Sequence, residues 1–284
     1  MKLRISLVDY LNSAPLGWSF LHGPLKGKFE VVRSSPAECA DQLARGEVDV
    51  GLIPSIEYQR IPDLRIIPGI AVAASNRVRS VLLVRPKGRP EIRSVALDTS
   101  SRTSATLVRI LLERRMGLRP ELVPHMPEID GMLGRCDAAL IIGDAALRLP
   151  ADKYEILDLA QAWIEWQKLP FVFAFWACRA ELEADPELVP IFHEARSWGL
   201  EAREEIAEAY AGILNLSEAS LREYLHFNVD YNLGRPHVDG LTRFFHLAFE
   251  MKAIPELRPL DFLPIITIDD LSIESGFPIV NRQS

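Results

Sequence analysis

The sequence has few cysteines, no long apolar run and no excess of positive charge, and each absence excludes a class of protein. Its 284 residues include three cysteines, Cys39, Cys136 and Cys178, at wide spacings and without a C-x-x-C pair. We therefore expect buried free thiols rather than a disulfide framework or a cysteine zinc site. The formal net charge of -7 argues against a general nucleic-acid-binding protein. An acidic chain can still hold a small anion through a few local donors.

Membrane-spanning and secretion patterns are also missing. No stretch approaches the roughly 18 consecutive apolar residues that a membrane-spanning helix needs. The first apolar run, residues 3–8, is short and ends at Asp9, so it predicts a β-strand rather than a signal peptide. We expect a cytoplasmic protein without membrane or nucleic-acid partners, and a homodimer is among the assemblies that the sequence allows.

The motifs of nucleotide, metal and serine-hydrolase sites do not occur. The chain lacks G-x-G-x-x-G, G-x-x-x-x-G-K-[ST], G-x-S-x-G and H-E-x-x-H. None of the six histidines has metal-ligand spacing to another histidine or to a cysteine in the α/β part of the chain. We therefore expect neither a metal nor an organic cofactor.

The sequence does contain an internal repeat. Residues 3–53 and 93–141 share one order of features: an apolar run that ends at an aspartate, a polar cluster, and later a G-x-x-D segment that opens a second apolar run. The two aspartates that end the first runs are Asp9 and Asp98. Such a repeat predicts two similar α/β lobes, and small ligands commonly bind in a cleft between lobes of this kind.

The hydrophobic pattern also predicts where each lobe begins and ends. Apolar runs predict strands at residues 3–8, 29–32, 48–53, 66–74, 80–84, 93–97, 137–142 and 170–177. Residues 184–253 are mostly amphipathic helix, and Lys87–Pro90 is a turn. We predict an α/β, two-lobed fold with two crossovers and a C-terminal helical segment. Residues 1–86 and 178–284 would form the first lobe and residues 87–177 the inserted second lobe; residues 264–284 receive no assignment within it.

A hydroxyl-rich segment follows the predicted strand 93–97 and opens a helix that is expected to run from residue 102 to residue 116. Its members are Thr99, Ser100, Ser101, Arg102, Thr103 and Ser104. Unpaired N–H groups and the positive end of the helix dipole face outward at such a helix start. Five hydroxyls there exceed what an N-cap needs, so we expect the segment to bind a carboxylate or phosphate. The alternative is an ordinary N-cap with solvated hydroxyls.

Further candidate ligand-binding residues lie at the other predicted strand ends and near the first crossover. They are Asn12, Ser13, Ser55, Ser80, Gly143 and Asp144. Asn12 and Ser13 occupy in the first lobe the place that the hydroxyl-rich segment occupies in the second, where a turn role competes with a binding role. Ser55 follows a strand, and a helix-cap role competes with binding there. Ser80 lies near the first crossover, where both lobes would touch a ligand.

Four segments, spread in order over most of residues 1–260, share a more specific pattern. They are Leu7–Leu16, Gly46–Tyr58, Asp98–Ser104 and Leu169–Ala177. Together they resemble the chorismate dehydratases of the futalosine route to menaquinone, although Lys168 stands where that family often has glycine. The resemblance implies a type II periplasmic-binding-protein-like fold and a cofactor-independent carbon–oxygen lyase of the hydro-lyase class. Its substrate would be the dianion chorismate, which loses water to give 3-[(1-carboxyvinyl)oxy]benzoate.

The resemblance also implies roles for individual residues. Asn12 matches the family's asparagine, so we expect it to donate to the departing hydroxyl or to orient a substrate carboxylate; Ser80 is the second catalytic candidate. One substrate carboxylate would lie on the helix start at Ser100–Ser104. No Glu, His or Lys stands out as a general base, which suggests that the substrate's own side-chain carboxylate removes the proton.

Two other interpretations remain open at this point. One is the sister enzyme that forms 1,4-dihydroxy-6-naphthoate, whose typical Ser-Pro-rich opening is absent from this sequence. The other is a non-catalytic protein that binds or senses a small carboxylate, because one fold supports many functions.

Overall fold

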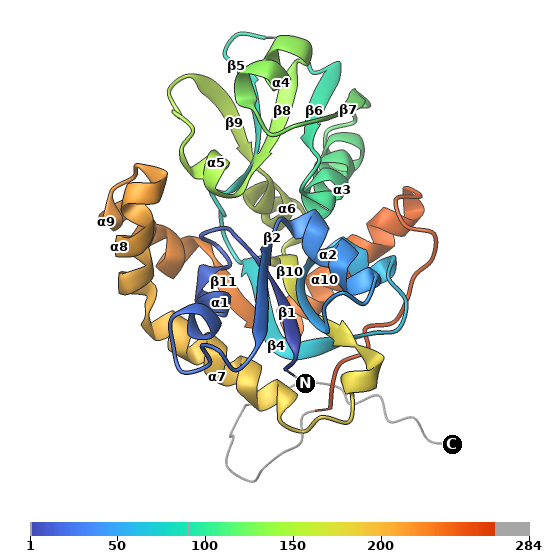
Figure 1. Cartoon of the computed structure of the whole chain (residues 1–284). Coiled ribbons are helices and arrows are strands. Elements are labelled where there is room, and N and C mark those ends of the chain that lie inside the picture. Colours follow the sequence, from blue (N-terminus) through green and yellow to red (C-terminus); the bar gives the residue numbers. More distant parts are fainter. Residues whose placement is uncertain (1, 90, 265–284) are drawn as a thin grey trace.

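The computed structural model describes residues 2–89 and 91–264, which form two β-sheets in two lobes (Figure 1). The strands are β1 (Arg4–Val8), β2 (Glu30–Ser34), β3 (Val50–Pro54), β4 (Leu64–Ala74), β5 (Val81–Pro86), β6 (Ser94–Asp98), β7 (Glu121–His125), β8 (Ala138–Ile142), β9 (Tyr154–Asp158), β10 (Phe171–Arg179) and β11 (Asp230–Leu233). The first sheet has the order β11-β4-β10-β3-β1-β2, and the second has the order β7-β6-β8-β5-β9. The predicted two-lobed α/β class with two crossovers is confirmed.

Helices cover both sheets. The α-helices are α1 (Ala14–Leu21), α2 (Pro36–Ala44), α3 (Arg102–Ile110), α4 (Ile129–Arg135), α5 (Gly143–Leu147), α6 (Leu159–Gln167), α7 (Leu188–Glu201), α8 (Arg203–Leu214), α9 (Glu218–Glu223) and α10 (Arg235–Glu250). Short 3₁₀ helices are η1 (Ser55–Gln59) and η3 (Ala180–Leu182), and π-helical turns are η2 (Leu111–Arg115) and η4 (Tyr224–Asn228). The expected C-terminal helical segment corresponds to α7–α10.

The internal repeat is present as a repeated sheet. In the first lobe β1 runs parallel to both β2 and β3, and in the second β6 runs parallel to both β7 and β8. An antiparallel strand then follows in each sheet, β10 beside β3 and β5 beside β8. Each of these two strands is the first that the chain forms after it has crossed from the other lobe.

The aspartate of each repeated G-x-x-D segment binds backbone N–H groups at the start of the neighbouring strand, in both lobes. Asp49 accepts a hydrogen bond from the backbone N–H of Arg4 at 2.8 Å, and its own N–H donates to the Arg4 carbonyl at 2.9 Å. Asp137 in turn accepts from the N–H groups of Arg93 and Ser94 at 2.9 and 3.1 Å. The two aspartates therefore hold together the starts of neighbouring parallel strands, far from the strand ends where a ligand would bind.

The limits of the lobes differ from the expected range of 87–177 for the second lobe. Residues 81–86 form β5 in the second sheet, and residues 171–179 form β10 in the first sheet. The turn at residues 87–89 thus lies inside the second lobe. The first crossover, residues 75–80, contains neither glycine nor proline, the two strongest turn signals. Residues 265–284, most of the unassigned tail, lie outside the described part of the chain.

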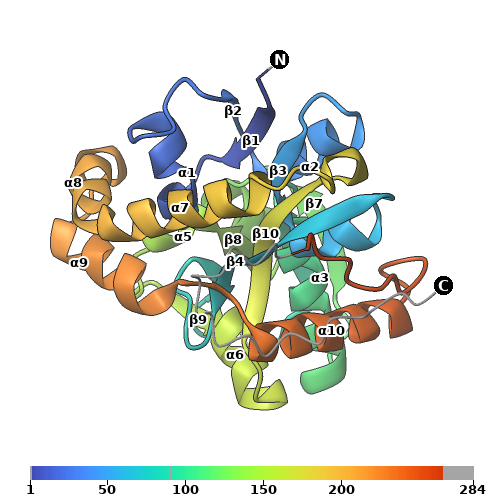
Figure 2. The same ribbon diagram turned by 90° about the horizontal axis from the view of Figure 1, so that it is seen from below.

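Strand β10 is apolar from Phe171 to Cys178 because both of its faces are covered there. Phe171, Phe173 and Phe175 belong to a core cluster that they share with α3, α6 and α10, whereas Trp176 and Cys178 pack in the cluster that includes α1 and α7. Figure 2 shows α7 and α10 on opposite sides of this strand.

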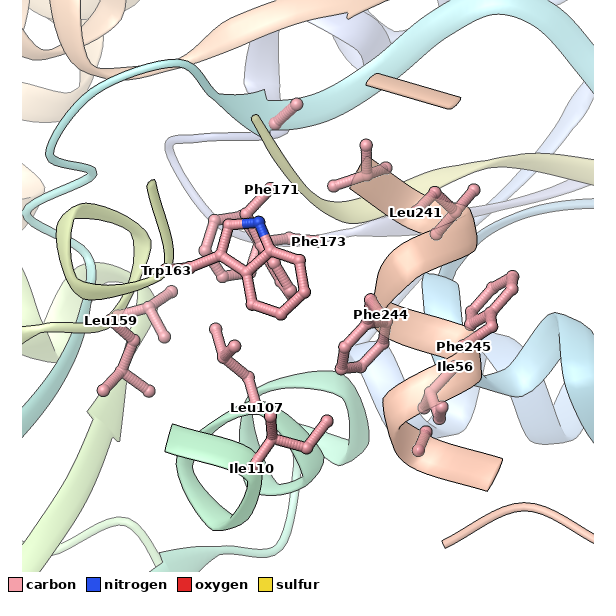
Figure 3. Packing of buried hydrophobic residues seen from close by; sticks show 14 of the residues in the cluster. Ile56, Leu107, Ile110, Leu159, Trp163, Phe171, Phe173, Leu241, Phe244 and Phe245 are labelled. Carbon is pink, nitrogen blue, oxygen red and sulfur yellow. The ribbon is translucent and has the colours of Figure 1, made fainter. Parts of the chain in front are cut away.

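One apolar core crosses from lobe to lobe. Trp163 of α6 packs with its ring centroid 5.3 Å from that of Phe171 and 6.2 Å from that of Phe244 in α10. Leu107 and Ile110 of α3 complete this contact (Figure 3). We call these five residues the interlobe core. It fixes the direction of α3 relative to the first lobe.

Loss of the Asp137 carboxylate should destabilise the fold. We expect Asp137→Ala to lower the free energy of unfolding by about 1–2 kcal/mol at neutral pH, because two backbone N–H groups lose their acceptor. The N–H of Arg93, with Ser94 adding to it, lowers the pKa of Asp137 in the folded state. The contribution is therefore present above the pKa of the unfolded carboxyl, about 4, and is lost as the pH falls through the lower folded value.

Urea unfolding at a series of pH values measures this effect. Asp152→Ala, at an exposed aspartate with no hydrogen-bond partner among the described residues, serves as the control and should leave stability unchanged. A difference between wild type and Asp137→Ala that stays constant into acid would contradict the assignment.

Candidate active site

A pocket of about 490 Å³, counting the solvent at its mouth, lies where the two lobes meet. It is lined by Val8, Tyr10, Asn12, Ser13, Pro36, Leu52, Pro54, Val72, Phe173 and Ala174 from the first lobe and by Val81, Ser101, Thr103, Ser104, Ile142 and Gly143 from the second. Among these described lining residues Tyr10 is the only titratable one. The pocket is therefore an apolar cavity with a few neutral polar groups, the usual construction of a small-molecule site.

The structure brings half of the candidate residues to this pocket. Those that line it are Asn12, Ser13, Ser101, Thr103, Ser104 and Gly143, and those that do not are Ser55, Ser80, Thr99, Ser100, Arg102 and Asp144. The first group comes from both lobes, as the repeat predicted. Apart from the exposed Thr99, the members of the second group make hydrogen bonds or ion pairs around the pocket.

The start of α3 presents unpaired donors to the pocket. Ser101 is the N-cap residue, but its side chain makes no capping hydrogen bond. Ser101 and Ser104 are 6% and 3% exposed, and within the described residues neither hydroxyl has a hydrogen-bond partner. The N–H groups of residues 102–104 likewise find no acceptor in that part of the chain. Buried donors of this kind at a positive helix end favour an anionic ligand.

Two of the other three hydroxyls of the segment, those of Ser100 and Thr103, are used within the protein. Ser100 donates to Asp98 at 2.6 Å. Thr103 Oγ1 accepts from the backbone N–H of Ile56 at 3.1 Å and lies 3.4 Å from the Ser55 hydroxyl, which donates to the Val172 carbonyl at 2.8 Å. Ser55 and Thr103 therefore join the two lobes, and the exposed Thr99 lies outside the pocket.

Arg102 is held away from the pocket by ion pairs across the lobe boundary. Its guanidinium donates to Asp41 of α2 at 2.8 Å and to Glu57 of η1 at 2.8 Å. The Glu57 side chain is 5% exposed and also pairs with Arg60 at 2.6 Å. Because its donors are engaged by these carboxylates, Arg102 fixes the beginning of α3 instead of facing a ligand in this arrangement.

Asn12 places a free amide at the opposite wall. Its Oδ1 accepts from the Ser13 hydroxyl at 3.1 Å, while its Nδ2 has no acceptor among the described residues. The Ser13 hydroxyl also lies 3.2 Å from the Tyr10 carbonyl oxygen. The Asn12 carbonyl end is thus oriented by the protein, and its NH₂ group is left for a ligand.

Ser80 lies behind the wall of the pocket. It is fully buried, its carbonyl accepts the N–H of Gly143 at 2.8 Å, and its hydroxyl oxygen accepts from Tyr224 at 2.7 Å. Burial raises the pKa of Tyr224, so this phenol remains a donor at ordinary pH. The next residue, Val81, lines the pocket.

Tyr10 is a pocket residue that was absent from the candidates, although it lies in the same strand-end segment as Asn12. Its ring packs on Gly143, where φ is +61° and an added Cβ would lie 3.0 Å from the ring. Its hydroxyl lies 3.5 Å from that of Ser100, and burial raises its pKa. The signal available in the sequence was its position, directly between the strand end at Asp9 and the next pocket residues.

The described residues show no sign of two other kinds of site. They contain no group of three or more His, Cys, Asp or Glu side chains arranged to hold a metal ion. None of their helices is both long and apolar enough to cross a membrane.

A family model described as "Menaquinone biosynthesis" matches residues 3–250. The chain belongs to this family. Its relatives include a chorismate dehydratase of Thermus thermophilus, 35% identical over 258 residues, and one of Campylobacter jejuni, 27% identical over 242 residues. Each alignment covers 84% of this chain and 93% of the relative. The resemblance seen in the four sequence segments is confirmed.

Solved structures show how this family chain is folded. An Archaeoglobus fulgidus protein superposes with a TM-score of 0.72 at 20% identity, covering 89% of this chain and 98% of its own. The periplasmic aliphatic sulphonate binding protein SsuA of Escherichia coli gives 0.63 at 16%, covering 90% and 94%. A Candida albicans protein described as having the generic periplasmic binding protein fold gives 0.63 at 12%, covering 93% and 98%. The family chain therefore has a periplasmic-binding-protein-like fold.

Removal of the free hydroxyls at the start of α3 should weaken anion binding. We expect Ser101→Ala and Ser104→Ala each to weaken binding of 3-[(1-carboxyvinyl)oxy]benzoate by about tenfold or more, because a hydrogen bond to a charged group contributes roughly 1.5–3 kcal/mol. Titration calorimetry measures the dissociation constants. Thr99→Val is the matched control, since its hydroxyl belongs to the same segment but lies outside the pocket. Equal effects at all three positions would contradict the assignment.

Proposed function

We propose that this chain is a chorismate dehydratase, a hydro-lyase that converts chorismate to 3-[(1-carboxyvinyl)oxy]benzoate. The observation that carries the proposal is the pocket between the lobes, in which free neutral donors from Asn12 and from the start of α3 face one apolar cavity. Two comparisons also support the proposal: the chain belongs to a menaquinone biosynthesis family, and it has chorismate dehydratases among its relatives.

The reaction suits a site of this kind. The C3–H bond of the cyclohexadiene ring breaks and its electron pair enters the ring, while the C4–O bond breaks and the hydroxyl leaves; the proton and the hydroxyl together make one water. The ring becomes aromatic, so the elimination is strongly downhill. The protein then has to hold the substrate in the reactive conformation and to stabilise the leaving oxygen.

The pocket offers neutral hydrogen-bond donors for both substrate carboxylates. We assign one carboxylate to the start of α3, with Ser101, Ser104 and the N–H groups of the first helical turn. Asn12 Nδ2 would donate to the departing hydroxyl or orient the other carboxylate. Ser80 lies behind the pocket wall, so we assign it a supporting role there: its carbonyl holds the Gly143 N–H and its hydroxyl accepts from Tyr224.

The proton acceptor is proposed to be the side-chain carboxylate of the substrate. The described lining residues offer no carboxylate, imidazole or amine that could act as the base. They also offer no cation, and a nearby cation would lower the pKa of a carboxylate and weaken it as a base. A pocket with neutral donors therefore preserves the basicity that a substrate-assisted elimination requires.

Asn12→Ala should abolish most of the activity. Removal of one hydrogen-bond donor at a reacting oxygen costs on the order of a hundredfold in kcat, and we expect a loss of that size. Incubation of purified protein with chorismate, with the product followed by chromatography, measures it. Asn76→Ala, at an exposed asparagine, is the control and should match wild type. If wild type forms no product but still binds chorismate or another small carboxylate, the chain is a binding or sensing protein instead.

The pH profile tests the substrate-assisted step. Burial raises the pKa of Tyr10, the titratable residue among the lining residues, so it stays neutral through the range of the assay. We expect kcat/KM to be level between about pH 6.5 and pH 9, because the substrate carboxylate is ionised throughout. A bell-shaped profile with a limb near pH 7, or turnover of an analogue without the side-chain carboxylate, would instead indicate a protein base.

A further inference from the structure

The segment that carries Asn12 is held by residues of the opposite lobe. Residues 9–13 connect β1 to α1, and the backbone N–H of Leu11 donates to Asp144 Oδ1 at 3.0 Å. The preceding residue, Tyr10, packs its ring on Gly143. Two consecutive residues of the second lobe therefore contact the two residues that precede Asn12.

Asp144 does not face the ligand itself. It is not among the residues that line the pocket, and it lies in the first turn of α5. A carboxylate beside a dianionic substrate would repel it, whereas a carboxylate that accepts a backbone N–H and lies at a helix start is well placed. The group was a candidate for substrate binding, and its contacts suit a different task.

Leu11 is fixed from two sides. Its side chain is fully buried in the core of the first lobe, and its N–H is bound by the second lobe. The amide of Asn12 comes next in the chain and has its Oδ1 oriented by Ser13. A displacement of about 1 Å at a reacting contact can cost on the order of a hundredfold in rate, so the position of Leu11 bears directly on the reaction.

We propose that Asp144 is a positioning residue that places the Asn12 amide by anchoring Leu11 across the lobe boundary. This inference rests on the proposed dehydratase function. It makes the assembly of the site conditional on contact between the lobes, since Asn12 takes its working position when the second lobe is in place.

A double-mutant cycle separates positioning from general support of the fold. We expect Asp144→Ala to lower kcat about tenfold with little change in KM, because substrate is still held at the start of α3. Asp144→Asn keeps an acceptor oxygen for the Leu11 N–H and should stay close to wild type. Since Asp144 acts through Asn12, the double variant Asn12→Ala, Asp144→Ala should be no slower than Asn12→Ala alone.

Asp137→Ala is the matched control for this cycle. It removes the same kind of contact, an aspartate that accepts backbone N–H groups, in the same lobe but far from the pocket. Asp137→Ala should have the kcat of wild type, and the double variant Asn12→Ala, Asp137→Ala should have the kcat of Asn12→Ala. Asp144→Ser, whose shorter side chain cannot reach Leu11, replaces Asp144→Ala if the latter does not fold.

Amide hydrogen exchange gives a readout that does not depend on catalysis. Residues 10–13 should exchange faster in Asp144→Ala and as slowly as wild type in Asp144→Asn. Unchanged exchange in Asp144→Ala, or a double variant slower than Asn12→Ala by the full factor of the single change, would overturn the positioning role. Absence of product from wild type would instead defeat the dehydratase function, and the exchange measurement would still decide whether Asp144 anchors the segment.

Discussion

The architecture of the site depends on the interlobe core, in which Trp163 packs against Phe171 and Phe244 beneath α3. Rings buried against one another resist displacement because any gap forfeits close contacts. The N-terminal end of α3 lies at the pocket, so a helix direction fixed by that core also fixes where its free N–H groups point. Arg102, paired with Asp41 and Glu57, adds a polar constraint at that end of the helix.

Charge is arranged around the pocket and not in it. The protein carries a net charge of -7, and its pocket is lined by neutral groups among the described residues, yet the proposed substrate is a dianion. Helix N–H groups and hydroxyls can bind an anion without a counter-charge, because their hydrogens and the positive end of the helix dipole point at it. The nearby arginine is neutralised by two carboxylates. An arrangement of this kind selects for the shape and donor pattern of a carboxylate more than for charge alone.

Much of the fold could be predicted from the sequence, because the repeated order of apolar run, aspartate and polar cluster reflects a repeated sheet. The limit of the second lobe was placed at residue 87 because glycine and proline mark a turn at 87–90, whereas the crossover at 75–80 contains neither. The elements α1, β7, α4, α5, β9, α6 and β11 were missed because short elements carry little periodicity. At the site, position along the chain located the start of α3 but could not say which hydroxyls face the pocket. Ser101 and Ser104, three residues apart, share a helix face, whereas Thr103 points to Ile56. The ion-pair partners of Arg102, Asp41 and Glu57, lie far from it in the sequence, so these contacts could not be predicted from the sequence pattern.

The chain leaves the first lobe after β4 and returns to it only with β10, and this order has a consequence for synthesis of the chain. The second sheet, β5 to β9, is built from one continuous stretch, residues 81–158, and is complete once that stretch has left the ribosome. The first sheet starts earlier but needs β10 and β11, which are made after the whole second lobe. While the second lobe folds, β3 and β4 therefore lack their shared neighbour β10 and expose unpaired backbone groups. These open edges are the part of the nascent protein most exposed to mispairing.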